Sequence, residues 1–139
     1  MVLDSNLLIY AAELGYDEIR RFIAQHESYL SVISKIEVLG YHQLPTEQRQ
    51  KLEKLFEIAM ILPLTAEIVE AAITLRQQRN MSLGDSIIAA TAMVHEMTLA
   101  TANIHDFEWI ENLQLINPLN EHESDKVGKM SFCFAHHNE

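Results

Sequence analysis

Short apolar runs alternate along the chain with longer segments in which apolar residues recur at helical spacing. The short runs predict strands at residues 1–4, 29–32, 61–64, 97–101 and 113–117. The intervening segments predict helices at residues 7–12, 17–25, 33–40, 46–59, 65–78 and 83–95. Strands that alternate with helices are typical of a parallel sheet covered on both faces. The pattern therefore predicts an α/β fold, with the almost wholly apolar segment 83–95 buried at its centre.

The pattern changes after Pro118, where the residues become polar and lose any periodicity. We therefore expect a folded domain at residues 1–119 and a polar, disordered tail at residues 120–139. Cys133, His136 and His137 in this tail resemble a soft-metal cluster. They have no fourth ligand, which favours an interpretation as ordinary tail residues.

Composition narrows the class of protein. The 139 residues are 48% hydrophobic, enough for one domain with a substantial core. A single Cys forms no internal disulfide, which indicates a reducing compartment, and we expect a cytoplasmic location. No apolar run approaches the roughly 20 residues of a membrane span, and the first residues lack the basic region of a secretory signal.

The net charge is −10 at pH 7, from ten Lys and Arg against twenty Asp and Glu. Taken alone, this charge argues against a protein that coats nucleic-acid phosphates. The distribution of the acids therefore decides the interpretation, because acids spread over solvated surfaces and acids gathered in one site have different chemistry.

Four acids stand where an open α/β sheet would form a site. Asp4 closes the first predicted strand, and Glu37 lies one turn into the helix after the second. Asp85 is at the start of the apolar helix, and Asp106 follows the fourth strand. Ligands of such sheets bind at the carboxyl ends of the strands. The four acids are therefore placed to meet at one edge.

Each acid also has a purely structural explanation. Asp4 or Asn6 can cap the first helix, and Ser34 with Glu37 has the spacing of a capping box. Asp85 can serve only the dipole of its helix, and the fourth acid can start a turn. Against these alternatives, carboxylates in apolar surroundings are costly, and no Lys or Arg stands beside Asp4 or Asp85 in the sequence.

Clustered carboxylates repel one another and raise one another's pKa unless a cation holds them. Hard divalent ions such as Mg²⁺ and Mn²⁺ prefer oxygen ligands of this kind. Such an ion can activate a water, and a pair of ions can stabilise both the attacking and the leaving oxygen of a phosphodiester. The four acids therefore suggest metal-dependent hydrolysis.

Four segments resemble the motifs of a known family. They are Leu3-Asp4-Ser5-Asn6, residues 31–37, residues 83–92 with Leu83-Gly84-Asp85-Ser86, and residues 101–107. Any one of them is a weak signal, but four in this order and spacing are strong. Over residues 2–119 the chain resembles a PIN domain, and more narrowly the VapC-type toxin ribonucleases of type II toxin–antitoxin systems.

The resemblance implies a three-layer α/β/α sandwich with a central, mainly parallel sheet. It also implies a Mg²⁺- or Mn²⁺-dependent endoribonuclease that leaves a 5′-phosphate and a 3′-hydroxyl. The partners implied are an RNA substrate, most plausibly transfer RNA, a cognate antitoxin protein that inhibits the site, and a second copy of the chain in a homodimer. No membrane partner is implied.

By the same resemblance, Asp4, Glu37, Asp85 and Asp106 are the metal-binding and catalytic acids. Asp4 and Asp85 would hold the principal metal, and Glu37 would ligate it or orient the attacking water. Asp106 would complete the site or support a second metal. The polar residues expected to orient these groups are Asn6, Thr101 and Asn103.

Two further positions concern the substrate. Lys35, on the same helical turn as Glu37, is the best candidate for an RNA contact among the basic residues. The middle residue of the family's Thr-x-Asn element is often Arg, and here it is Ala102.

The sequence is also compatible with two other functions. One is a catalytically inactive PIN-like module that binds RNA or protein without turnover. The other is a metal-dependent phosphohydrolase of small phosphoesters.

Overall fold

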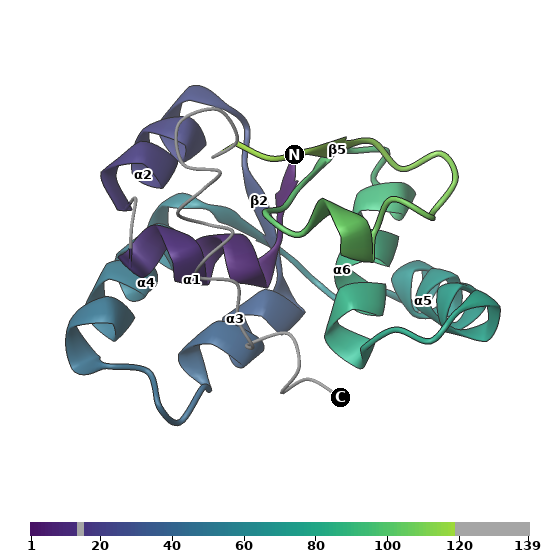
Figure 1. Cartoon of the computed structure of the whole chain (residues 1–139), viewed down its shortest axis with the longest axis horizontal. Coiled ribbons are helices and arrows are strands. Elements are labelled where there is room, and N and C mark those ends of the chain that lie inside the picture. Colours follow the sequence, from purple (N-terminus) through teal and green to yellow (C-terminus); the bar gives the residue numbers. More distant parts are fainter. Residues whose placement is uncertain (14–15, 119–139) are drawn as a thin grey trace.

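A computed structural model of the chain describes residues 1–13 and 16–118 (Figure 1). Its elements in chain order are β1 (Val2–Leu3), α1 (Ser5–Glu13), α2 (Tyr16–Gln25), β2 (Tyr29–Ser31), α3 (Val32–Leu39), α4 (Thr46–Ile58), β3 (Met60–Leu62), α5 (Ala66–Gln78), α6 (Leu83–Val94), β4 (Leu99–Ala100), a 3₁₀ turn η1 (Ile104–Asp106) and β5 (Leu115–Ile116). The predicted tail from Asn120 lies outside the described residues.

The five strands form one parallel sheet in the order β3-β2-β1-β4-β5. The first strand of the chain is therefore central, with Val2 opposite both Tyr29 of β2 and Leu99 of β4. Since all strands run the same way, their carboxyl ends lie at one edge of the sheet. The residues that follow β1, β2 and β4 are brought together at this edge.

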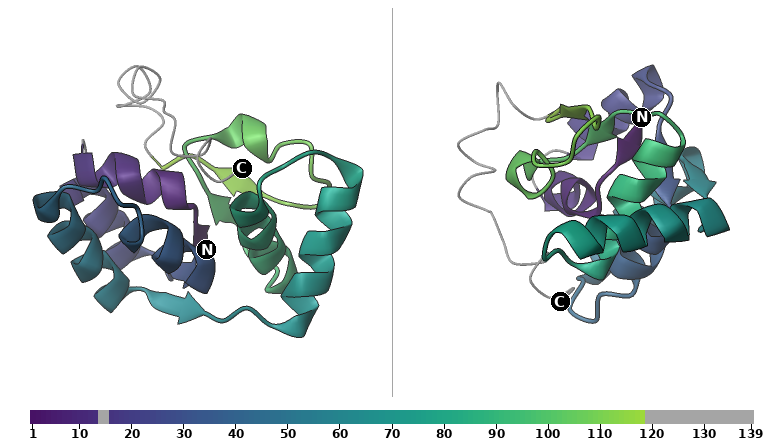
Figure 2. Two further views of the ribbon diagram at one scale, coloured as in Figure 1. Left: turned by 90° about the horizontal axis from the view of Figure 1, so that it is seen from below. Right: turned by 90° about the vertical axis from the view of Figure 1, so that its right-hand side faces the viewer.

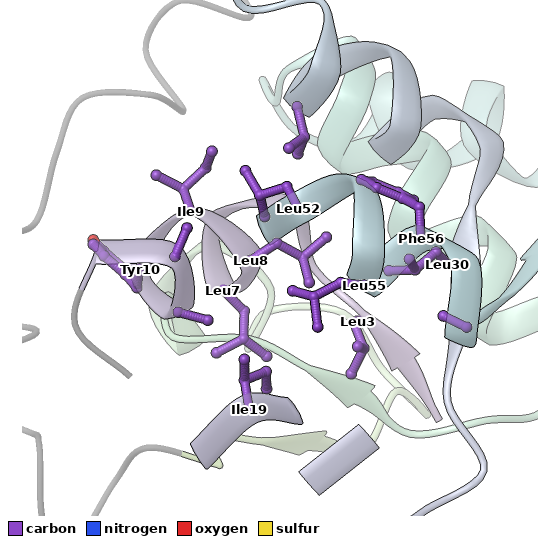
Figure 3. Packing of buried hydrophobic residues seen from close by; sticks show 14 of the residues in the cluster. Leu3, Leu7, Leu8, Ile9, Tyr10, Ile19, Leu30, Leu52, Leu55 and Phe56 are labelled. Carbon is purple, nitrogen blue, oxygen red and sulfur yellow. The ribbon is translucent and has the colours of Figure 1, made fainter. Parts of the chain in front are cut away.

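Two apolar cores cover the two faces of the sheet. One is formed by α1, α2 and α4, where Leu7 and Leu8 pack with Leu52 and Leu55 around Leu3 of β1 (Figure 3). The other is formed by α5 and α6 with β4. Figures 1 and 2 show these two groups of helices on opposite sides of the sheet. The predicted α/β fold with a parallel sheet and helices on both faces is confirmed.

The strands are shorter than the apolar runs predict. β4 has two residues where the pattern indicated five, and it pairs with β1 only through Leu99 and Ala100. The central strand β1 is itself two residues long, which limits the number of residues that can pair between β1 and β4. Helix boundaries agree with prediction to within a few residues, and α6, with eight of its twelve residues buried, is the central apolar helix expected.

No helix in the described part of the chain has the length and apolar character that crossing a membrane requires.

Candidate active site

Asp4 and Thr101 are joined at the carboxyl edge of the sheet. They follow β1 and β4, which are paired so that Leu3 lies opposite Ala100. Asp4 and Thr101, which directly follow this pair, therefore lie side by side. Thr101 Oγ1 donates a hydrogen bond of 2.7 Å to Asp4 Oδ2. The Asn103 backbone N–H donates to the same Thr101 oxygen at 2.9 Å. This fixes the Thr101 hydroxyl and, through it, the Asp4 carboxylate.

Asp4 is almost completely buried, with 1% of its surface exposed. Burial raises its pKa to about 7, against the lowering effect of the Thr101 hydrogen bond, and the charges of Glu37 and Asp106 raise it further. Asp4 also directly precedes α1, so it occupies the capping position considered above. The capping position is compatible with an interaction with other acids, because the charges of Glu37 and Asp106 act on Asp4.

Glu37 does not belong to a capping box. The N-cap of α3 is Ser31, whose side chain accepts from the Ile33 N–H, so Ser34 and Glu37 lie inside the helix. The Ser5 hydroxyl donates to Glu37 Oε1 at 3.0 Å and forms a 2.9 Å hydrogen bond with the Ser34 hydroxyl. The capping-box alternative is therefore wrong, because the helix begins earlier than that spacing assumed.

The Glu37 carboxylate is half-buried and points to the start of α6. Burial raises its pKa to about 7, the Ser5 hydrogen bond acts in the opposite direction, and the charge of Asp85 raises it. A Cβ atom at position 84 would overlap Glu37 Oε2. The carboxylate thus occupies space that any residue with a side chain at position 84 would take.

Asp85 stands in the first turn of α6 and is half-buried. Its backbone N–H donates at 3.1 Å to the hydroxyl of Ser82, the N-cap of the helix. The position favours a negative charge, as the dipole explanation requires. It also brings the Asp85 carboxylate close enough to Glu37 to influence its pKa, so the dipole is not its only electrostatic partner.

Asp106 ends the turn η1 and is exposed. The turn is anchored by Phe107, which is fully buried in the second core. The indole Nε1 of Trp109 donates to the Asp106 carbonyl oxygen at 3.1 Å. Asp106 therefore lies at the outer rim of the edge on which Asp4 is buried.

The remaining predicted site residues are in different surroundings. Asn6 is 7% exposed, and no hydrogen bond of its side chain occurs within the described residues. Asn103 is half-buried and acts through its backbone on Thr101. Lys35 is exposed, two positions before Glu37, and residues at this spacing point to different sides of a helix. The shared turn therefore does not put Lys35 over the Glu37 carboxylate.

The arrangement suits a hard divalent cation. Within residues 1–13 and 16–118, neither Asp4 nor Glu37 makes an ion pair with a basic side chain. In the same residues no three His, Cys, Asp or Glu side chains form a ready-made metal cage. Mg²⁺ does not need one, because it is commonly held by one or two carboxylates and keeps several waters. The buried carboxylates and the all-oxygen donor set fit such an ion.

Ser5, Ser34 and Gly84 are parts of this site that the sequence did not single out. The Ser5 hydroxyl donates to Glu37, the Ser34 hydroxyl bonds that of Ser5, and Gly84 leaves room for the Glu37 carboxylate. Ser5 and Gly84 each adjoin a predicted acid, and Ser34 lies one helical turn before Glu37. Their proximity to the acids was the available signal, but their contacts span about thirty or more sequence positions and are visible only in the fold.

Comparison with known proteins finds one matching family and several similar chains. The model of the family described as PIN domain matches residues 1–111. Ribonuclease VapC10 of Mycobacterium tuberculosis is 32% identical over 90 residues, which cover 61% of this chain and 66% of that protein, just under two thirds of its length. A toxin-antitoxin complex from Klebsiella pneumoniae contains a similar chain, with 28% identity, a TM-score of 0.65, and coverage of 84% of this chain and 96% of that one.

A second solved structure supports the fold alone. In the DNA-bound VapBC of Salmonella typhimurium, a chain with 17% identity gives a TM-score of 0.72, over 84% of this chain and 96% of that one.

Proposed function

Because the chain belongs to the PIN domain family, we propose that it is a metal-dependent endoribonuclease, the toxin of a toxin–antitoxin pair. The names of similar proteins support this proposal: one is a ribonuclease, and another comes from a toxin-antitoxin complex. One observation carries it. At the carboxyl edge of the sheet the buried Asp4 and the half-buried Glu37 have no basic partner among the described residues.

In this proposal Asp4 and Asp85 would hold Mg²⁺ or Mn²⁺, and Asp106 would complete the site. When bound, such an ion would supply positive charge that offsets the acids, polarises a phosphate and lowers the pKa of a bound water. The protein's own part is to hold the acids in place before the substrate arrives. Thr101 fixes Asp4, and Ser5 fixes Glu37.

Glu37 then orients the attacking water and takes one of its protons. A new bond forms between the water oxygen and phosphorus, and the bond from phosphorus to the 3′ oxygen breaks. The 3′ oxygen leaves with the electron pair of the broken bond and takes a proton from solvent water, while Glu37 returns its proton to solvent, so the products are a 5′-phosphate and a 3′-hydroxyl. Asn6 is buried and lies two residues after Asp4 in the sequence. In this proposal its side-chain amide holds a water in the site.

The test is cleavage of RNA by the purified protein with Mg²⁺ or Mn²⁺, and with EDTA in their place. We expect Asp4→Asn and Asp85→Asn to lower the cleavage rate by about 10³-fold or more, since each removes charge that positions the cation. Asp17→Asn removes an exposed acid of α2 and is the matched control, with full activity expected. Equal cleavage by all three variants would overturn the proposal.

The remaining partners follow as part of the same proposal. They are a transfer RNA substrate, a cognate antitoxin protein and a second copy of the chain, in the cytoplasm. Cleavage of isolated transfer RNAs, inhibition by the product of the neighbouring reading frame and the mass in solution test these three partners in turn.

A second candidate is a PIN-like module that binds RNA or protein without turnover. In its favour, no three His, Cys, Asp or Glu side chains of the described residues form a metal cage, although one or two carboxylates are enough for Mg²⁺. The two candidates differ in a metal titration with RNA present: binding of Mn²⁺ that Asp4→Asn abolishes supports the nuclease, and no binding supports the module.

A further inference from the structure

Trp109 forms a platform beside the acidic edge. It lies three residues after Asp106 and is tied to it by the 3.1 Å hydrogen bond from the indole to the Asp106 carbonyl. The ring is half-buried and packs against the second core, to which Phe107 and Ile110 of the same segment also belong. Trp109 is therefore a rigid aromatic surface at a fixed place relative to Asp106.

Arg79 covers this platform. Its guanidinium carbon lies 5.4 Å from the centroid of the Trp109 ring, a cation–π contact. Arg79 is the C-cap of α5 and opens the short connection to α6. The connection is held at both ends, because Arg76 Nε donates to the Met81 carbonyl at 3.2 Å and Ser82 caps α6.

Arg79 is related to two of the proposed site acids through the segments that carry them. In sequence it lies six residues before Asp85, with Ser82 fixing the intervening turn. In space it touches Trp109, which is bonded to the backbone of Asp106. Arg79 thus links the segment of Asp85 to the segment of Asp106 at the rim of the site.

The charge of Arg79 is exposed, and within residues 1–13 and 16–118 no carboxylate pairs with it. A net charge of −10 makes the long-range attraction of the chain for RNA weak, so local cations are needed to supply phosphate contacts. A guanidinium already held on an aromatic ring loses less freedom when it binds, and its N–H groups match two phosphate oxygens.

We propose that Arg79, held on Trp109, binds a backbone phosphate of the RNA next to the acidic site. The inference rests on the proposed function and adds to it a specific contact for the substrate. The contact lies on the Asp85 and Asp106 side of the site, whereas the previously considered Lys35 belongs to α3. A phosphate contact involves no base, so it contributes to affinity for single-stranded RNA of any sequence.

The experiment measures binding of a short fluorescent single-stranded RNA of mixed sequence as a function of salt concentration. All proteins carry Asp85→Asn to prevent cleavage, and Mg²⁺ is present throughout. Arg79→Gln is compared with Arg20→Gln, which removes the same charge from an exposed position on α2. Thermal unfolding checks that both variants fold.

For Arg79→Gln we expect RNA binding to be about 5- to 10-fold weaker at low salt. The slope of log K against log salt should fall in magnitude by about 0.7, which is the value for one phosphate contact on a single strand. Arg79→Lys should keep most of the slope. Trp109→Leu should weaken binding but keep the slope, because the charge remains. With Asp85 restored, Arg79→Gln should raise KM and leave kcat unchanged.

Equal affinities and slopes for Arg79→Gln and Arg20→Gln would overturn this inference, while cleavage by the unaltered chain would leave the nuclease proposal standing. A second result would also overturn the inference: Arg79→Gln no longer binds the protein product of the neighbouring gene, but its RNA binding keeps the same salt slope. That result would assign Arg79 to a protein interface. Failure of the unaltered chain both to bind and to cleave RNA would overturn both proposals.

Discussion

The Glu37 carboxylate lies against the backbone of Gly84, so that a methyl group at position 84 would overlap Glu37 Oε2 and lie 2.7 Å from its carboxyl carbon. The contact joins α3 to the first turn of α6. It has a simple physical meaning: the absence of a side chain at Gly84 creates the space in which Glu37 stands beside Asp85.

Gly84→Ala should therefore lower activity without unfolding the protein. The added methyl displaces the end of a flexible side chain, and Ala is favoured over Gly in a helix by about 1 kcal/mol, so the net change in stability should be small. A carboxylate moved by about 1 Å can cost roughly 100-fold in rate. Cleavage rates and urea unfolding of the same samples measure both effects.

The control is a double-mutant cycle with Glu37→Gln. If Gly84→Ala acts by displacing this carboxylate, it should add little to the loss already caused by Glu37→Gln. Fully additive losses would show that the glycine matters for another reason.

Thr101→Val should destabilise the protein by about 1–3 kcal/mol, because it leaves Asp4 Oδ2 and the Asn103 N–H without the buried hydroxyl that joins them. Thr101→Ser keeps the hydroxyl and should restore part of the loss. Thr91→Val is the matched control: this buried hydroxyl donates only to the Ile87 carbonyl of its own helix, so a smaller cost is expected. Urea unfolding ranks the three variants, and equal costs for both valines would contradict the assignment.

The metal-free protein should lose stability as the pH rises from about 4 to about 7. The pKa values of Asp4 and Glu37 are raised to about 7 from ordinary values of 3.8 and 4.5. In that interval the folded state holds more protons than the unfolded state, so the free energy of unfolding falls with pH and levels off above about 7. Unfolding in EDTA at pH 5 and pH 8 measures the difference. Asp4→Asn should reduce it, and an unchanged difference would count against burial of a charged Asp4.

Mn²⁺ or Mg²⁺ should stabilise the protein more at pH 8 than at pH 5, because the cation binds the ionised carboxylates and competes with protons for them. Thermal unfolding with increasing Mn²⁺ at each pH provides the measurement. Asp17→Asn should respond like the unaltered chain, whereas Asp4→Asn should respond weakly. An equal shift in Tm for both variants would place metal binding elsewhere.

The order of the elements was predictable because it depends on local patterning. Apolar residues at helical spacing predicted α4 and α5 to within a residue or two, and the unbroken apolar character of α6 predicted its burial. Strand length was not predictable to the same accuracy. An apolar run such as 97–101 continues beyond the two residues that find a partner in β1.

For the acidic edge, the sequence by itself determined which residues follow the strands: Asp4 after β1, Asp106 after β4 and Glu37 in the helix after β2. The rule that parallel strands end at one edge then indicated that their carboxylates approach one another. Only the tertiary structure decided how they are held. The Ser5–Glu37 and Thr101–Asp4 hydrogen bonds, the Glu37–Gly84 contact and the Arg79–Trp109 pair join residues that are 30 to 97 positions apart. Such contacts depend on register and side-chain packing across the whole fold, which no local pattern in the sequence encodes.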